Sequence, residues 1–470
     1  MGYEARIKRE RRTSGRTVGA SKKATIDLLA PSRLIQKHLT EGLCEEVFQE
    51  TRNRERKRVW SLYALVNFWN HIILHSPGSI TQAIEEAVRG EGKVWPATSG
   101  SPQAFFGRCQ TLTWKFFAAL FHRFTAAVAP EAKTAFAQEF HGLGRHFSNV
   151  WLVDGSRLDA IAHRLKILWD VRSSILPGCV IAFYDLFRGF PRVLGFDPDA
   201  ARAEMKRMME LLPQIPRGTL LLGDRLYASV KLFEDFGQRG LYGLCRLSQT
   251  LNLKKVRRLS KKRVDGGLLE DWVAEVGSGV TAPKQELRYI RFKKGRVVYE
   301  LLTNVLDPKK LPAETAIKLY PRRWDIERMF YDLKAVVGLH RFYAANPNAV
   351  AMQVFASALV YVAMRVAHAD AAVQAELSPE KLSPKKLFPR VAQCYAILAG
   401  VELGYLWTCK KNPGRRLKPP VLEGRPEFMV PLDEILVQKR SPVRRKRRYC
   451  RSRRRWKSFA HVSGGKRFIS

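Results

Sequence analysis

Acidic residues are scarce in this sequence: 43 Asp and Glu stand against 82 Lys and Arg, a formal net charge of +39 at pH 7. An excess of this size creates a long-range positive field, and nucleic acids are the commonest polyanions in a cell. A basic chain can also bind anionic membranes, but the sequence has no clear lipid anchor or basic amphipathic helix. The charge balance therefore favours a nucleic-acid partner.

Cysteines are few and scattered. Their number, seven, is odd, and no pair forms a CxxC motif. This argues against a disulfide framework and against a zinc site, and it is typical of proteins from a reducing compartment.

Long apolar runs are also lacking. The first nineteen residues contain no apolar segment of the kind that a secretory signal needs. The longest apolar stretch, Ala349 to Met364, contains Gln353 and Ser357 and is followed by Arg365, so it predicts a buried helix rather than a membrane span. We expect a cytoplasmic protein.

The length of 470 residues, with 46% apolar and 10% aromatic residues, predicts several folded domains. Helical patterns alternate with strand-like runs, which predicts a multidomain α/β protein with a mixed sheet flanked by helical N- and C-terminal regions. We predict a basic arm at 1–24 and a helical domain at 25–147. An α/β core follows at 148–247 and 312–370, and a β-rich basic insertion at 248–311 interrupts it. The chain then continues with a C-terminal helical region at 371–437, which is a candidate dimerisation region, and a basic tail at 438–470.

Two short apolar runs, VWLVD and GTLLLGD, end in Asp154 and Asp224. Binding and chemistry tend to collect at the carboxyl ends of strands in α/β sheets. The alternative for Asp154 is an Asx turn in DGS, and for Asp224 an N-cap before the helix that begins near Ser229.

The segment YPRRWDIERMFYDLK places Tyr320, Arg323, Glu327 and Lys334 within about 60° of one another on an ideal α-helix. The alternative is a solvated helix face, since Arg323 and Glu327 form an i, i+4 charged pair. A two-metal phosphoryl-transfer site needs hard oxygen ligands, and Asp154, Asp224 and Glu327 could supply them. Arg323 and Lys334 would then meet phosphate, and Tyr320 could donate a hydrogen bond to it.

Other acids are weaker candidates. Asp185 also ends a strand-like run and Asp159 lies near Asp154, but neither has the context of the two acidic motifs. Asp325 lies about 140° from the face of Tyr320, so we expect it to face solvent or the neighbouring arginines.

The chain resembles the DDE-type bacterial insertion-sequence transposases that carry a YREK signature. Tyr320, Arg323, Glu327 and Lys334 match that signature without a gap, DGS at Asp154 and GDRLY at Asp224 are similar to its two acidic motifs, and LLTN at Leu301–Asn304 is similar to the strand before the third. The resemblance covers roughly residues 146–370. It implies a ribonuclease H-like catalytic domain with a β-rich insertion between Asp224 and Glu327.

The resemblance also implies two Mg²⁺ or Mn²⁺ ions, nicking of transposon ends, hairpin formation and opening, strand transfer into target DNA, and a homodimer on paired ends in the bacterial nucleoid. An aromatic residue of the insertion stacks on a flipped base in this family, which makes Trp272 a candidate, and a core tryptophan is the alternative. A DNA-binding descendant without activity and a nuclease of the same fold remain open.

Basic segments provide further candidate DNA contacts. In the insertion these are Lys254, Lys255, Arg257, Arg258, Lys261, Lys262 and Arg263. We expect the helical domain at 25–147 to bind the transposon ends, with a surface for the terminal inverted repeats at Arg52, Arg54, Arg56, Lys57 and Arg58, where a solvated helix face is an equally good explanation. In the tail, the basic residues run from Lys439 to Lys457.

Overall fold

The structure is a computed structural model of the chain. It describes residues 24–51, 60–89, 100–158, 178–199, 204–277, 284–339, 342–343, 346–411, 418 and 420–437. The basic arm up to residue 23, the arginines at 52–58, Asp159 and the basic tail lie outside the described residues.

A nine-stranded mixed sheet forms the centre of the fold, in the order β4-β3-β2-β5-β6-β10-β9-β8-β7. The strands are β2 (Asn149–Arg157), β3 (Cys179–Asp185), β4 (Phe190–Asp197), β5 (Thr219–Gly223), β6 (Tyr242–Arg246), β7 (Leu253–Val264), β8 (Gly267–Val276), β9 (Gln285–Lys294) and β10 (Val297–Thr303). β2, β5 and β6 are parallel to one another, and every other neighbouring pair is antiparallel. The mixed α/β architecture expected from the sequence is thus confirmed.

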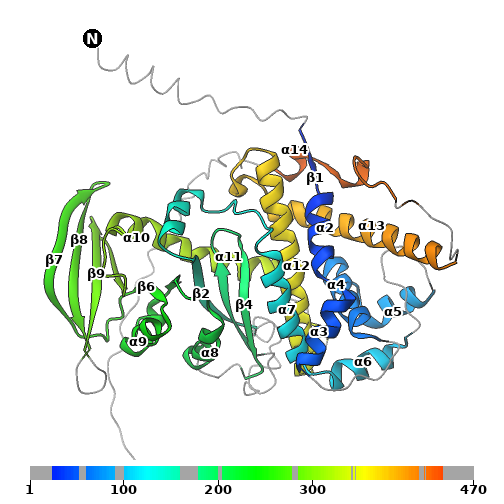
Figure 1. Cartoon of the computed structure of the whole chain (residues 1–470), viewed down its shortest axis with the longest axis horizontal. Helices are drawn as coiled ribbons and strands as arrows, with labels where there is room; N and C mark the ends of the chain where they lie inside the picture. Colours follow the sequence, from blue (N-terminus) through cyan, green and yellow to red (C-terminus); the bar gives the residue numbers. More distant parts are fainter. Residues whose placement is uncertain are drawn as a thin grey trace, which may run out of the picture. The chain divides into compact units, whose positions relative to one another are not determined.

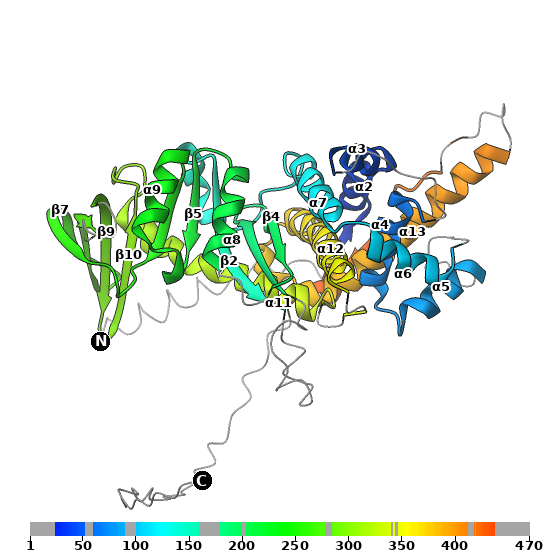
Figure 2. The same ribbon diagram turned by 90° about the horizontal axis from the view of Figure 1, so that it is seen from below.

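The central strands are buried on both faces, which explains their almost continuous apolar sequences. Alternate residues point to opposite faces. Leu152, Leu220 and Leu222 belong to a core shared with α11 (Trp324–Ala335) and α12 (Pro347–Gln374). Trp151, Val153 and Leu221 belong to a second core under α8 (Glu204–Leu211) and α9 (Val230–Arg239). Figure 2 shows α8 and α9 on one side of the strands and α11 on the other.

The β-rich insertion continues the sheet of the α/β core. β10 pairs with β6 over Leu301–Thr303, and the β9–β10 hairpin turns at Gly295, as the KKG sequence predicts. β7 is the outer strand of the sheet, and most of its side chains are exposed. The insertion therefore presents a basic strand at the edge of the sheet (Figure 1).

Helices from the N-terminal part of the chain pack around α12 (Figure 1). These helices are α2 (Leu29–His38), α3 (Glu41–Thr51), α4 (Leu62–His75), α5 (Ile80–Arg89), α6 (Pro102–Thr111) and α7 (Lys115–Val128). Their apolar side chains share one core with the sheet and α12. Among the described helices, α12 alone is long and apolar enough to cross a membrane, yet its most apolar window is entirely buried within the protein. It is the buried helix predicted from Ala349–Met364.

The remaining elements complete the described fold. They are η1 (Gln138–Arg145), η5 (Leu212–Gln214), η6 (Arg225–Tyr227), α10 (Ala313–Leu319), η7 (Tyr320–Arg323), η8 (Pro379–Lys381), α13 (Pro384–Lys411), η9 (Pro426–Phe428), α14 (Leu432–Ile435) and a two-stranded sheet of β1 (Thr25–Asp27) and β11 (Met429–Pro431).

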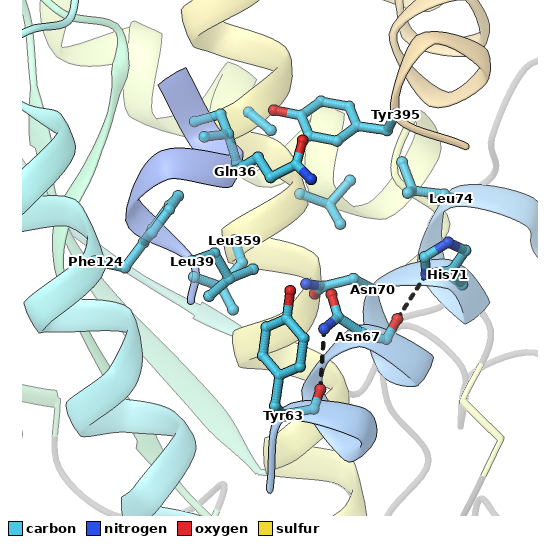
Figure 3. Close-up of a pocket in the computed structure, with 13 residues that line it drawn as sticks. Gln36, Leu39, Tyr63, Asn67, Asn70, His71, Leu74, Phe124, Leu359 and Tyr395 are labelled. Carbon is cyan, nitrogen blue, oxygen red and sulfur yellow. Dashed lines mark hydrogen bonds between the residues drawn. The ribbon is translucent and has the colours of Figure 1, made fainter. Parts of the chain in front are cut away.

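A cavity of about 90 Å³ lies among helices α2, α4, α7, α12 and α13 (Figure 3). Its lining is mainly apolar, but it also includes Asn70 and Tyr395, whose Oδ1 and hydroxyl oxygen are buried without a protein partner. A cavity of this size with two unpaired polar atoms suits a few water molecules. None of the predicted site residues lines it.

Two local predictions need correction. Tyr320 and Arg323 lie in the 3₁₀ turn η7, not in one continuous α-helix with Glu327, because Pro321 stands at the start of that turn. Asp154 does not end its strand, since β2 continues through Arg157 by antiparallel pairing with β3.

Candidate functional site

Asp154 and Asp224 lie at the same edge of the parallel strands. β2 pairs with β5 only as far as Leu152, so Asp154 lies beyond the end of that pairing. Asp224 directly follows β5 and caps η6, where its Oδ1 accepts a hydrogen bond from the Leu226 amide at 2.7 Å. The helix α9 is instead capped by Ser229. The two acids therefore lie at the same end of the parallel strands, where α/β proteins often bind ligands.

Arg323 joins two of the predicted acids. Its Nη1 lies 3.3 Å from Asp154 Oδ2, and its Nη2 donates to Glu327 Oε1 at 2.7 Å. Residues 152, 154 and 156 share one face of β2, the face that packs against α11. Strand alternation thus turns Asp154 toward the helix that carries Glu327.

Lys334 makes a second contact between the same two elements. Its Nζ donates to Ser156 Oγ at 2.9 Å, two residues after Asp154. Tyr320 is 7% exposed and packs in the core. The structure therefore brings Arg323, Glu327 and Lys334 to the first acidic motif.

The environment of Asp154 is unusual for a carboxyl group. Burial raises the pKa of Asp154 to about 6, although the Arg323 charge and the Gly155 amide oppose the shift. The carboxylates of Glu204 and Asp224 raise this pKa further. Shifts of this kind, caused by burial together with like charges, are found most often at functional sites.

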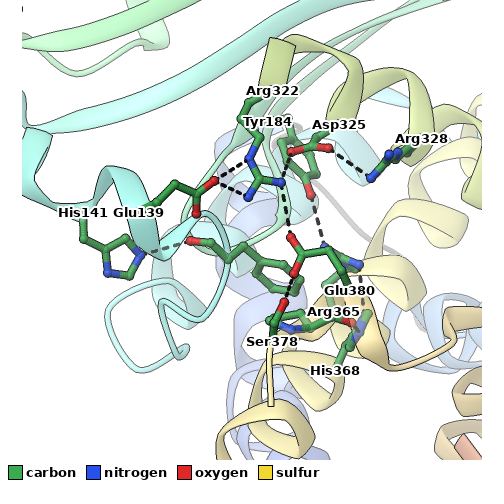
Figure 4. Close-up of polar contacts among 12 residues, drawn as sticks. Glu139, His141, Tyr184, Arg322, Asp325, Arg328, Arg365, His368, Ser378 and Glu380 are labelled. Atoms are coloured by element: carbon green, nitrogen blue, oxygen red, sulfur yellow. Dashed lines mark hydrogen bonds and ion pairs between the residues drawn. The ribbon is translucent and has the colours of Figure 1, made fainter. Parts of the chain in front are cut away.

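A second arginine anchors the start of α11. The Arg322 guanidinium donates to Glu139 Oε1 at 2.6 and 3.1 Å, and its Nη1 lies 3.2 Å from Glu380 Oε1 (Figure 4). Asp325 pairs with Arg322 and Arg328, as its angular offset predicts. Asp185 is buried and pairs with Arg188 and Arg192, so it has a structural role.

Two exposed aromatic residues lie on α11 beside Glu327. Trp324 is 59% exposed and Tyr331 is 68% exposed, and they are seven residues apart on one helical face. We did not predict them as site residues from the sequence. Their i, i+7 spacing places both aromatic rings on one side of the helix, but the sequence alone does not show that this side is exposed.

The insertion residues are less closely associated with the acids. Arg257, Arg258, Lys261 and Lys262 lie along the exposed edge strand β7. The Lys255 Nζ and the Arg258 guanidinium lie 5.1 and 5.7 Å from the Trp272 ring centroid, and the ring also packs against the core under α8 and α9. Trp272 therefore makes cation–π contacts with two basic side chains of β7.

The oxygen donors at this end of the sheet are chemically suited to Mg²⁺ or Mn²⁺, since both ions prefer carboxylates. Within the described part of the chain, no three His, Cys, Asp or Glu side chains are grouped closely enough to hold a metal ion. Arg323 instead links Asp154 to Glu327.

The part of the chain that carries most of these residues matches a known protein family. A family model described as a transposase DDE domain matches residues 178–363, which include Asp224, Glu327 and Lys334. Asp154 lies just before the matched segment.

Three relatives carry similar names. They are a putative transposase y4zB of Sinorhizobium fredii (26% identical, covering 39% of this chain and 51% of the relative), a probable transposase for insertion sequence element IS5377 of Geobacillus stearothermophilus (23%, covering 31% and 38%), and a putative transposase for insertion sequence element IS4SA of Synechocystis sp. (25%, covering 24% and 38%). The chain thus spans about half the length of the first relative and less of the other two.

A solved structure, a piggyBac transposase synaptic complex with hairpin DNA, aligns over 84% of this chain and 87% of its own, with 10% identity and a TM-score of 0.34. A likeness at that level supports no conclusion about this chain. The family match and the named relatives are more informative: residues 178–363 resemble a transposase DDE domain, and the chain is similar to insertion-sequence transposases.

Proposed function

We propose that this protein is a cut-and-paste DNA transposase that cleaves transposon ends and joins them to target DNA. The observation that carries the proposal is the contact of Arg323 with both Asp154 and Glu327, because it joins the first acidic motif to the third. The family match and the net charge of +39 support the same activity.

The proposed catalytic domain has a ribonuclease H-like fold. Five neighbouring strands support this assignment, since β2 lies centrally with antiparallel β3 and β4 on one side and parallel β5 and β6 on the other. The insertion strands β7 to β10 then extend the open edge at β6.

Asp154, Asp224 and Glu327 are the residues that would hold Mg²⁺ or Mn²⁺, two ions in the proposed reaction. When bound, such ions activate the attacking oxygen and stabilise the leaving oxygen of a phosphodiester. Arg323 and Lys334 add positive charge beside Asp154, where they would orient the phosphate, Arg323 by its planar fork and Lys334 as a point charge. Tyr320 supports η7 from the core, so we assign it to positioning Arg323.

Duplex DNA would bind along several surfaces of the chain. Arg257, Arg258, Lys261 and Lys262 on β7 are exposed and would contact phosphates without reading sequence. The exposed Trp324 and Tyr331 would contact bases or sugars next to the scissile phosphate, because stacking on an aromatic ring tolerates any base. Trp272 is a weaker candidate for stacking on a flipped base, because Lys255 and Arg258 already lie over its ring.

Three further parts of the proposal rest on the resemblance to DDE transposases alone. They are a hairpin intermediate at the transposon end, a homodimer on paired terminal inverted repeats, and action on DNA in the bacterial nucleoid.

The experiment that tests the proposed function is cleavage of a DNA fragment carrying the flanking ends of the element, with Mg²⁺ or Mn²⁺. Native protein is compared with Asp154→Asn, Asp224→Asn and Glu327→Gln, and Asp185→Asn serves as a matched acid outside the site. We expect native protein to cut at the ends and the three site variants to bind without cutting. If native protein binds the ends but never cuts them, the protein is a DNA-binding protein and not a transposase. If it cuts the ends but never joins them to target DNA, it is a nuclease of the same fold.

A further inference from the structure

The helical part of the chain contains a space that the proposed function does not use. It is the cavity of about 90 Å³ among α2, α4, α7, α12 and α13 (Figure 3). Spaces between packed helices are common positions for small-molecule sites. Because α2 and α13 come from distant parts of the chain, a molecule in this cavity would contact helices that only the tertiary structure brings together.

Apolar side chains form most of the cavity wall. Ile35 and Leu39 on α2, Phe124 on α7, and Leu359 and Ala363 on α12 line it, and none of these five is more than 8% exposed. A buried water molecule needs about two to four polar partners, and this wall provides none. Water against the wall is therefore poorly held, and an apolar group that displaces such water gains binding free energy.

Two polar side chains of the lining have a buried atom without a hydrogen-bond partner among the described residues. They are Asn70 on α4, through its Oδ1, and Tyr395 on α13, through its hydroxyl oxygen (Figure 3). Asn70 is only 9% exposed, and burial raises the pKa of Tyr395, so its hydroxyl keeps its proton. An unpaired buried polar atom costs free energy. A ligand hydroxyl could pair with either atom, because a hydroxyl both donates and accepts.

The cavity lining carries no charged side chain among the described residues. The Asn67 amide donates to the Tyr63 carbonyl at 3.1 Å, and His71 Nδ1 lies 2.8 Å from the Asn67 carbonyl, so it donates there. Burial lowers the pKa of His71, so its ring is neutral at pH 7. A charged ligand would lose its hydration here without gaining an ion pair, which favours an uncharged one.

We propose that this cavity binds a small uncharged ring compound that carries a hydroxyl group. The ring lies against the apolar wall of α12, and the hydroxyl pairs with the buried atoms of Asn70 and Tyr395. A cavity of roughly 150 Å³ can hold benzene, so the smaller volume here limits the ligand to about one six-membered ring. The acids at the edge of the sheet do not line this cavity, so the inference does not depend on the proposed function.

The test uses phenol as the probe and measures its binding to the full-length protein by saturation-transfer difference NMR, without DNA. We expect native protein to bind phenol with a dissociation constant of about 1 mM or lower. Toluene has the same size but no hydroxyl, so it should bind more weakly. Ala363→Leu fills part of the cavity and should weaken phenol binding about tenfold or more.

Two variants test the polar contacts without filling the cavity. Tyr395→Phe and Asn70→Leu should each weaken phenol binding about fivefold, the loss of one hydrogen bond, and leave toluene binding unchanged or stronger. Tyr343→Phe, a tyrosine outside the cavity whose hydroxyl donates to the Pro77 carbonyl, should bind phenol as native protein does.

Three results would overturn the inference. Native protein that binds no phenol has a cavity for water only. Equal phenol binding by native protein, Tyr395→Phe and Asn70→Leu would remove the polar contacts, and full binding by Ala363→Leu would place phenol elsewhere. Thermal unfolding verifies that each variant folds, and if Ala363→Leu does not fold, the other two variants decide. None of these results bears on DNA cleavage, so the proposed function is tested separately.

Discussion

At the scale of single residues, Arg323 is the side chain that links two acidic residues of the candidate site. Its side chain is 11% exposed, and its guanidinium contacts carboxylates from two elements, Asp154 on β2 and Glu327 on α11. A planar fork can serve two carboxylates at once, whereas a lysine ammonium presents a single charge. The spacing of Arg323 and Glu327 is visible in the sequence, but the contact with Asp154 is not, because 169 positions separate the two residues.

We predict that Arg323→Ala lowers DNA cleavage by about 10²-fold, because it removes a charge that would stabilise the transition state. Arg323→Lys should recover little of the activity, since one ammonium cannot replace the fork. Single-turnover cleavage of an end-containing fragment measures the effect. Arg328→Ala is the control on the same helix, where the side chain is 71% exposed. Equal rates for Arg323→Ala and Arg328→Ala would contradict the role of Arg323.

At the scale of elements, a buried ion pair holds two strands of the insertion together. Arg288 on β9 is completely buried and donates to both carboxylate oxygens of Asp271 on β8, at 2.8 and 2.6 Å. Its Nη1 also donates to the Leu311 carbonyl at 2.6 Å, just before α10. The insertion hairpins and the segment that leads to η7 are thereby held together.

We predict that Arg288→Met lowers the free energy of unfolding by about 3 to 5 kcal/mol, because it leaves Asp271 charged and buried without its partner. Urea unfolding followed by circular dichroism measures the change. The exposed pair of Lys284 and Glu275 provides the contrast, and Lys284→Met should lower the free energy of unfolding far less than Arg288→Met. A double variant, Arg288→Met with Asp271→Leu, should be more stable than Arg288→Met alone.

The basic edge strand β7 makes a separate prediction at the same scale. Replacing Arg257, Arg258, Lys261 and Lys262 by Ala should weaken binding of any duplex. It should also reduce the slope of log affinity against log salt concentration by about 0.9 for each DNA phosphate that the variant no longer neutralises. Fluorescence anisotropy at several salt concentrations measures this slope. Lys231→Ala on α9 serves as a control, and an unchanged slope in the fourfold variant would exclude β7 from DNA binding.

At the scale of the whole molecule, α12 joins the helical region to the sheet and carries polar groups into the core. Arg365 is buried, donates to the Gly189 carbonyl at 2.7 Å and lies 4.0 Å from the Phe136 ring centroid. Its Nη1 also lies 3.0 Å from His368 Nδ1, and His368 Nε2 lies 2.8 Å from the Pro379 carbonyl (Figure 4). These contacts require a neutral His368 that accepts at Nδ1 and donates at Nε2.

We predict that the protein loses stability as pH falls from 7 to 5. Burial first, and then the Arg365 charge, lowers the pKa of His368 to about 3. Its ordinary pKa is near 6.5, so between these values the unfolded chain binds more protons than the folded one. Stability is therefore full above pH 6.5 and falls below it, by up to about 1.4 kcal/mol per pH unit for each such group. Burial lowers the pKa values of His75 and His122 to about 4, which adds to the effect.

Urea unfolding at pH 7 and pH 5 measures this loss. His368→Gln cannot take up the proton, so the difference between the two pH values should be smaller in that variant than in native protein. An equal difference in both proteins would show that His368 does not contribute to the pH dependence.

The sequence by itself determined much of this protein. Strand and helix periods depend on neighbouring residues, so they could be read locally, and they predicted the mixed sheet and the β9–β10 hairpin. The short motifs are local as well, and they predicted the resemblance to DDE transposases that the family model finds over residues 178–363. Only the tertiary structure decided which residues meet. Arg323 reaches Asp154, Lys334 reaches Ser156 and Glu204 reaches the space above Gly155, because strand alternation and helix packing bring distant positions together. The exposure of Trp324 and the continuation of one sheet from β6 into the insertion likewise depend on neighbours that no local pattern specifies.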